Sequence, residues 1–317
     1  MASIFLIFVK IEFIIDSCFF GGMIMFKLTC CSTVDLSNEF LEANNVKYIS
    51  YKYMIDGKEY YDDMGNSISS DKFFKQIEDG AEPVTSQINS EEYIKFFEPL
   101  LKEGEDILHV CLSSGLSGSY NSARIAKEYL DEKYPDRKLY IVNSLGASSG
   151  SGLLVSYLID MRDSGESIDK CFEWAEDNKL NVHHWFISTD LTSYRRGGRI
   201  SSTSFFFGKL LRICPLMNMD YNGKLIPRKK IRTKEKALVE LANMASLHAN
   251  DALNYNGKCY ISHSASLNDA KKLKGYIEES FVNLKGKVEI YNIGTVIGSH
   301  SGPGTIALFF MGDKRID

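Results

Sequence analysis

The chain has 317 residues, of which 44% are hydrophobic and 25% charged, and it contains only six prolines. These proportions are typical of folded domains with substantial cores, and they exclude a disordered or fibrous chain. The net charge of −4 argues against a general nucleic-acid surface or a surface for anionic membranes.

Positive charge is nevertheless concentrated in one segment. Residues 181–236 contain twelve Lys or Arg and three Asp or Glu, within a chain that is acidic overall. Such a segment is either a solvated basic face or a contact for a phosphate, a carboxylate or an acidic partner.

The first 24 residues do not resemble part of a domain. Three charged residues interrupt the apolar run over residues 1–20, no basic segment begins it, and no small-residue cleavage site follows it. The run therefore lacks features that a signal peptide requires, and its uninterrupted apolar part is too short to span a membrane. The sequence predicts an N-terminal extension over 1–24, with translation starting at Met23 or Met25 and no stable membrane insertion; a membrane anchor is the alternative.

The seven cysteines show no C-x-x-C spacing, which predicts reduced structural thiols in a cytoplasmic protein. Adjacent Cys30 and Cys31 should point to opposite faces of a strand, so they cannot readily chelate one ion. We therefore predict no metal site. His109, inside an apolar run, is expected in the core, whereas His183 and His184 are expected to form a surface pair.

In the N-terminal half, strands and helices are expected to alternate. Strands are predicted at residues 26–31, 46–55, 106–112 and 138–143, with a hairpin signal at Asp56-Gly57. Helices are predicted after the capping residues Ser70 and Ser90 and over 120–130, 153–161 and 168–177. This is the pattern of a parallel sheet with helices on its faces, and its functional loops should follow the strands.

The pattern changes in the C-terminal half. Strands are predicted at residues 185–188, 213–219, 224–231, 259–262, 288–291 and 305–311, and helices at 233–248 and 267–281. The sequence therefore predicts an α/β protein of two domains. Residues 25–180 form a parallel-sheet α/β/α domain, and residues 181–317 form an α+β domain with a mixed sheet.

Four short stretches are rich in glycine, hydroxyl or basic side chains. They are PVTSQ at 83–87, SSGLSGSY at 113–120, RRGGRI at 195–200 and IGSHSGPG at 297–304. Glycines let the backbone approach a ligand closely, and hydroxyls and backbone N–H groups donate to anions. Any one of these stretches alone is more often a turn or a helix cap.

Together, in this order and at this spacing, the four stretches resemble the DegV family, from Phe26 to the end of the chain. The resemblance implies two α/β domains with a long-chain fatty acid at their interface, the carboxylate in the cleft and the acyl chain in an apolar tunnel. It implies Thr85, Ser117 and His300 as the ligands of the carboxylate. The same resemblance places a further set near the cleft or a partner: Ser86, Ser114, Gly118, Arg195 and Arg196.

The resemblance also implies a role without catalysis. Better understood members carry the acyl group for a fatty acid kinase whose separate ATP-binding subunit phosphorylates the carboxylate. No cofactor is implied, and the chain has no nucleotide-binding motif or helix-turn-helix signature of its own. Three positions depart from the family pattern: Cys31 replaces an aspartate, Ile88 a proline and Cys214 a lysine.

The alternative function is a serine hydrolase. Residues 146–150, GASSG, fit G-x-S-x-G between an expected strand and an expected helix, which would make Ser148 the nucleophile. Asp190 and either His263 or His300 follow in the order of a triad. No HGGG-type oxyanion motif precedes the serine.

Overall fold

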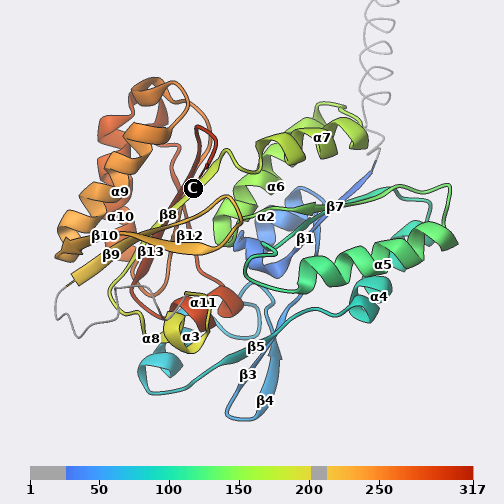
Figure 1. Ribbon diagram of the computed structural model, residues 1–317, viewed down its shortest axis with the longest axis horizontal. Coiled ribbons are helices and arrows are strands. Elements are labelled where there is room, and N and C mark those ends of the chain that lie inside the picture. Colours follow the sequence, from blue (N-terminus) through green and yellow to red (C-terminus); the bar gives the residue numbers. More distant parts are fainter. Residues whose placement is uncertain (1–25, 201–212, 317) are drawn as a thin grey trace, which may run out of the picture.

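Three sheets organise the computed structural model, which describes residues 26–200 and 213–316 (Figure 1). The first sheet is parallel throughout, in the order β2 (Lys47–Ile49), β1 (Lys27–Cys31), β6 (Ile107–Cys111) and β7 (Leu139–Asn143). Its faces are covered by α4 (Ser90–Lys102) and α5 (Ser119–Lys133) on one side. The other side is covered by α2 (Asn38–Ala43), α6 (Ser148–Asp163) and α7 (Ile168–Asn178). The predicted α/β/α arrangement is confirmed.

A small antiparallel sheet follows, in the order β4 (Lys58–Tyr61), β3 (Lys52–Ile55) and β5 (Val84–Ser86). The stretch 46–55, predicted as one strand, divides between two sheets because pairing with β1 ends at Ile49. The Asp56-Gly57 hairpin is confirmed, since both residues have the positive φ that its turn requires. The caps of α3 (Ser70–Glu78) and α4 are Ser69 and Asn89, each one residue earlier than predicted.

The third sheet is mixed, and its strands all come from residues 182–311. Its order is β10 (Leu225–Arg232), β9 (Ile213–Met219), β8 (Val182–Ser188), β13 (Thr305–Met311), β11 (Cys259–His263) and β12 (Glu289–Asn292). Only β11 and β12 are parallel. Helices α9 (Lys234–His248) and α10 (Leu267–Ser280) pack on this sheet. The short helices α8 (Thr192–Arg196) and α11 (Thr295–Ser301) contact each other, and α11 also contacts α3 and strands β3 and β5 of the small sheet.

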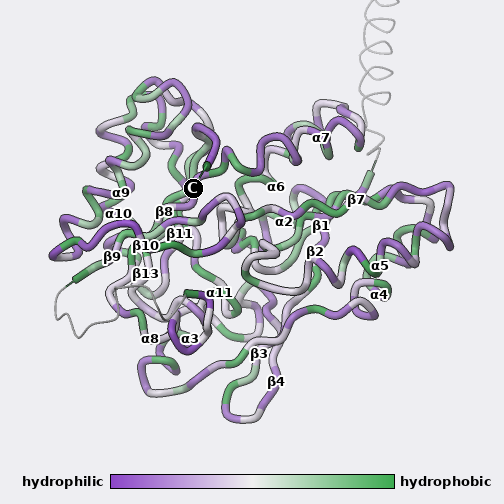
Figure 2. Tube along the Cα trace, in the orientation of Figure 1, coloured by the Kyte–Doolittle hydropathy of each residue, from purple (hydrophilic) through white to green (hydrophobic). Residues whose placement is uncertain are grey.

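Helix α6 joins the two halves. It contacts β1 and β6 of the parallel sheet and β8, β11 and β13 of the mixed sheet, so it lies between them (Figure 1). Its residues are buried on nearly every side, as a helix in that position requires. Figure 2 shows hydrophobic residues along the strands of both large sheets and many hydrophilic residues on the outer helices. We propose the domain boundary near residue 180, between 25–180 and 181–317, where the chain leaves α7 for β8.

Two histidine predictions have different outcomes. His109 lies fully buried on β6, as predicted. The surface interpretation of His183 and His184 is wrong, because β8 is an inner strand of the mixed sheet and both side chains are buried. No helix in the described ranges combines the length and apolarity needed to cross a bilayer. The expected extension over residues 1–24 lies outside those ranges.

Candidate functional site

A cavity lies between the parallel-sheet half and the mixed-sheet half. The space between its walls is about 820 Å³, a volume that includes space open to solvent. Both halves contribute to its walls, which are largely apolar. Apolar side chains of the mixed-sheet half that line it include Phe186, Tyr194, Met219, Leu225, Ala307 and Phe309.

The structure brings the three predicted carboxylate ligands into this cavity. Thr85 on β5, Ser117 before α5 and His300 on α11 all line it, and so does Ser86. The oxygen Thr85 Oγ1 lies 2.7 Å from His300 Nε2, although 215 positions separate the two residues. Residues that are distant in the sequence therefore converge on one wall.

His300 lies on a short helix, α11, that packs against α3. Gly298 permits this packing, because a Cβ there would lie within 3 Å of the rings of Phe73 and Phe74. The motif glycine thus serves helix packing.

The His300 ring is neutral near pH 7. Burial lowers its pKa from 6.5 to about 4, and Arg199 and Arg196 contribute in the same direction. Its Nδ1 atom is buried, faces Gly197, and has no hydrogen-bond partner among the described residues. A buried N–H without a partner is costlier than a lone pair, which favours a hydrogen on Nε2. Nε2–H then donates to Thr85, whose hydroxyl hydrogen is left for an anion.

Ser117 is positioned by its own loop. Its Oγ accepts a hydrogen bond from the Ser119 backbone N–H at 3.2 Å and lies 3.0 Å from Ser119 Oγ. When the Ser119 hydroxyl donates in that pair, the Ser117 hydroxyl hydrogen is left for a ligand. The loop is fixed across the interface, because Ser113 Oγ donates to the Gly223 carbonyl at 2.8 Å. At Gly115 a Cβ would lie 2.6 Å from the carbonyl oxygen of Asn222, so glycine permits this docking.

The other predicted residues lie around the cavity and not in its lining. Ser114 is exposed and hydrogen-bonded to Asn143, and Gly118 is the N-cap of α5 beside Gln87. Arg195 and Arg196 line a separate hollow with Thr192 and Ile200. A guanidinium nitrogen of Arg196 lies 3.4 Å from a carboxylate oxygen of Glu82.

The arginine that lines the cavity is Arg199, which the sequence prediction did not select. Its Nε donates to the Leu116 carbonyl at 3.2 Å, and a terminal nitrogen donates to the Gly197 carbonyl at 2.6 Å. These bonds hold a positive charge beside the three ligand residues. The motif RRGGRI indicated a basic loop, but it did not show which of its arginines faces the cavity. The backbone path through Gly197 and Gly198 decides this, and the φ of Gly198 is +67°.

His184 is the second lining residue that sequence reasoning missed. Its Nδ1–H donates to the Val182 carbonyl at 3.0 Å, and its Nε2 accepts from the Ala147 N–H at 3.3 Å. Burial holds its pKa well below the usual value, so the ring is neutral. It therefore contributes a hydrogen-bonded, uncharged wall.

Ser148 also lines the cavity, with a positive φ of 54°. Its hydroxyl donates to the buried Asp35 carboxylate. The remaining triad candidates are engaged elsewhere: Asp190 accepts from Thr192, and Nδ1 of His263 accepts from a backbone N–H. Hydrogen bonds among the described residues thus do not form a Ser–His–Asp arrangement at Ser148.

Comparison with known proteins covers nearly the whole chain. The family profile described as "Uncharacterised protein, DegV family" matches residues 25–313. A DegV domain-containing protein of Clostridium perfringens is 37% identical over 285 residues, which are 90% of this chain and 96% of that protein. One from Streptococcus pyogenes is 34% identical over 291 residues, or 91% and 99% of the two chains.

Solved structures give the same result for the fold. A DegV lipid-binding protein from Thermotoga maritima aligns with a TM-score of 0.76 at 25% identity, covering 91% of this chain and 99% of that one. A Thermus thermophilus DegV family protein, solved in a study of its fatty acid binding, aligns with a TM-score of 0.80 at 24% identity, covering 91% and 100%. The chain belongs to the DegV family.

Proposed function

We propose that the chain binds one long-chain fatty acid in this cavity. Thr85, Ser117 and His300 form the carboxylate site: the Thr85 and Ser117 hydroxyls donate to the anion, and His300 Nε2–H holds the Thr85 hydroxyl in position. Arg199 adds positive potential, and the apolar side chains of the mixed sheet cover the acyl chain. The contact between Thr85 and His300 in an apolar cavity that Ser117 also lines carries the proposal. DegV structures solved with vaccenic, heptadecanoic or stearic acid support it.

The chemistry suits a ligand that must be held and later released. Neutral hydroxyl donors, one of them held by an uncharged imidazole, bind a carboxylate less tightly than a bidentate arginine would. Most of the affinity would come from the tail, at roughly 0.8 kcal/mol per buried CH₂ before the costs of binding are subtracted. We propose no catalytic role and no cofactor, and we propose a cytoplasmic location.

The direct test is to identify the lipid that purified protein releases on denaturation, by mass spectrometry. We expect about one equivalent of a free fatty acid of roughly sixteen to eighteen carbons, because burial of such a tail is favourable enough to keep the lipid bound during purification. The proposal fails if no lipid is released and delipidated protein takes up none.

A substitution at Gly197 tests the position of His300 without altering a ligand residue. A Cβ there would lie 2.2 Å from His300 Nδ1, while the φ of −69° is allowed for any residue. Gly197→Ala should displace the ring, break its bond to Thr85 and weaken fatty acid binding by roughly tenfold or more. Gly275→Ala, on an open face of α10, is the matched control and should leave binding unchanged. Equal affinities for both variants in lipid displacement would contradict the assigned geometry.

We also propose, from the family resemblance, that the bound carboxylate is presented to the ATP-binding subunit of a fatty acid kinase. Arg196 lies outside the cavity lining, at the hollow near the cleft, so Arg196→Ala should spare lipid binding but impair phosphoryl transfer. The assay uses the cognate kinase subunit. Normal transfer by both Arg195→Ala and Arg196→Ala would refute this role.

One observation favours the serine hydrolase alternative: Ser148 lines the cavity at a strained backbone position. Its hydroxyl nevertheless donates to Asp35, whose pKa burial and the charge of Asp62 raise well above the usual value. A fluorophosphonate probe distinguishes the two functions. We expect no labelling of Ser148.

A further inference from the structure

A second group of reactive side chains lies inside the parallel-sheet half. Cys31 ends β1, and Cys111 ends the neighbouring strand β6, one position beyond the last registered pair, Cys30 and Val110. His109 precedes Cys111 by two residues and so shares its face. Cys31, His109 and Cys111 are all fully buried.

Their ligand atoms form a compact cluster. Cys31 Sγ lies 3.6 Å from His109 Nε2, and the two sulfur atoms and the nitrogen are all within 4.8 Å of one another. The hydroxyl oxygen of Tyr93, on α4, lies 3.4 Å from Cys31 Sγ and 3.7 Å from Cys111 Sγ. In a tetrahedral zinc site, sulfur and nitrogen ligands are separated by about 3.6 Å, as the Zn–S and Zn–N bond lengths require.

The surroundings orient the imidazole as a ligand. His109 Nδ1 lies 2.8 Å from Thr29 Oγ1, so an Nδ1–H that donates to Thr29 leaves the Nε2 lone pair directed at the thiols. The rings of Phe96 and Phe97 pack around the imidazole, with centroid distances of 6.2 and 5.0 Å. The cluster is thus dry and pre-oriented.

We propose that Cys31, His109 and Cys111 bind one Zn²⁺ ion, with the Tyr93 hydroxyl oxygen completing a tetrahedron. Binding releases the two thiol protons, and the two thiolates balance the charge of the ion, so the buried assembly is neutral. Sulfur and imidazole ligands select zinc over magnesium or calcium. The ion would join β1, β6 and α4 beneath the loop that carries Ser117.

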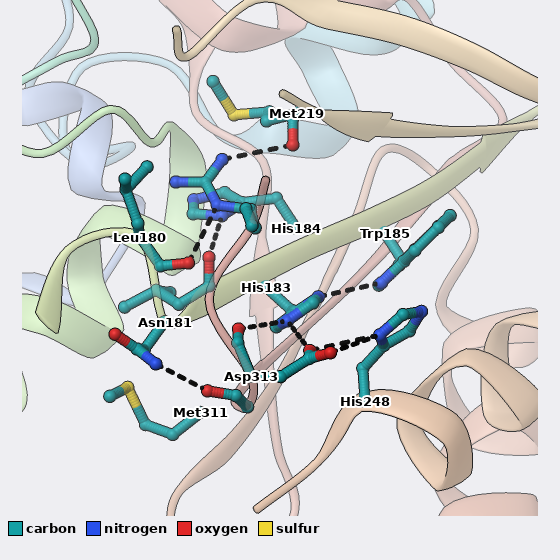
Figure 3. Close-up of polar contacts among 12 residues, drawn as sticks. Leu180, Asn181, His183, His184, Trp185, Met219, His248, Met311 and Asp313 are labelled. Atoms are coloured by element: carbon teal, nitrogen blue, oxygen red, sulfur yellow. Dashed lines mark hydrogen bonds and ion pairs between the residues drawn. The ribbon is translucent and has the colours of Figure 1, made fainter. Parts of the chain in front are cut away.

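A second cluster, of His183, His248 and Asp313, looks similar, but its His183 has no free lone pair (Figure 3). Trp185 Nε1 can only donate, and it donates to His183 Nδ1 at 3.2 Å. The ring hydrogen must therefore sit on Nε2, which donates to the Asp313 backbone carbonyl at 2.9 Å. This cluster fastens the C-terminal segment to β8 and offers no nitrogen of His183 to a metal.

Because the proposed zinc site is fully buried, it should fill during folding. The full-length chain is refolded with Zn²⁺ or Co²⁺, desalted, and analysed for metal by plasma mass spectrometry. We expect about one equivalent of zinc, and in the cobalt form a thiolate charge-transfer band with the intense d–d bands of tetrahedral coordination. Cys31→Ser and Cys111→Ser should reduce the bound metal at least tenfold.

Cys30→Ser is the matched control. Cys30 is equally buried and adjacent in sequence, but it packs into the opposite core, so this variant should keep its metal. Wild-type protein that refolds without stoichiometric metal would overturn the proposal, as would equal loss in Cys30→Ser and Cys31→Ser. A Cys31–Cys111 disulfide, seen as two fewer free thiols in denatured metal-free protein, would also overturn it. The wild-type cobalt spectrum decides the matter even if a variant fails to fold.

Discussion

Replacing Ser117 and His300 together by alanine is expected to reduce the affinity for a fatty acid by well over tenfold. Ser117→Ala removes a donor to a charged group, which costs about 1.5–3 kcal/mol, or roughly ten- to a hundredfold in affinity. His300→Ala removes the Nε2–H that holds the Thr85 hydroxyl in position for the same carboxylate. The two losses should be less than additive, because both act on one carboxylate and water can partly replace either group. Affinities are measured by displacement of a fluorescent lipid.

A fatty alcohol of the same chain length provides the ligand control. It lacks the anion, so the double variant should bind it nearly as well as the wild type does. Since Ser117 also accepts from the Ser119 N–H, unfolding is measured separately to detect any loss at the start of α5. Equal losses for acid and alcohol would mean that the residues shape the cavity and do not bind the carboxylate.

His300→Gln tests the protonation state within the same experiment. A glutamine amide can donate toward Thr85 but carries no charge. Because burial keeps the imidazole of His300 neutral, this variant should recover much of the affinity lost in His300→Ala. No recovery would indicate that a protonated ring binds the carboxylate.

The sequence predicted the sheets well where each strand is a short apolar run between turn signals. Strands β1 and β6 of the parallel sheet and β9 and β13 of the mixed sheet are examples, because they are buried on both faces. Boundaries were less predictable where tertiary packing decides them. Helix α6 begins at Ser148 and not at the predicted residue 153, because small residues pack between two sheets there.

The candidate site was predictable only in part. Thr85, Ser117 and His300 were identified from motif resemblance, and the structure places all three in one cavity. Arg199 was not predicted, because the sequence does not show which arginine of the loop faces the cavity; the path of the backbone decides that. His184 was missed because its burial depends on how strand β8 pairs.

The proximity of Cys31 and Cys111 could not be predicted from the sequence for a related reason. We predicted no metal site because Cys30 and Cys31 point to opposite faces of a strand, and Cys30 does pack into the opposite core. Strand order places β6 beside β1, and no local pattern specifies that order. Contacts between distant segments therefore limit what a single sequence reveals.

Acid is expected to destabilise the protein through His183, by up to about 3 kcal/mol between pH 6.5 and pH 4. Burial lowers the pKa of His183 from 6.5 to about 4, more than the favourable interactions with Asp313 raise it. In this pH window the unfolded chain binds a proton that the native state does not, so stability falls as the pH falls. Each pKa unit corresponds to about 1.4 kcal/mol. The Trp185 N–H also opposes a second proton, because it donates to Nδ1, the atom that this proton would need.

The test compares urea unfolding of wild type and His183→Asn across this pH range. The asparagine oxygen can still accept from Trp185, but the variant loses the donor to Asp313 and should be less stable at pH 7. Buried Asp35 has a raised pKa and changes stability in the opposite direction, so only the difference between the two proteins isolates His183. That difference should stay constant above pH 6.5 and shrink by about 3 kcal/mol toward pH 4. A difference that is independent of pH would mean that native His183 takes up its proton as readily as the unfolded chain does.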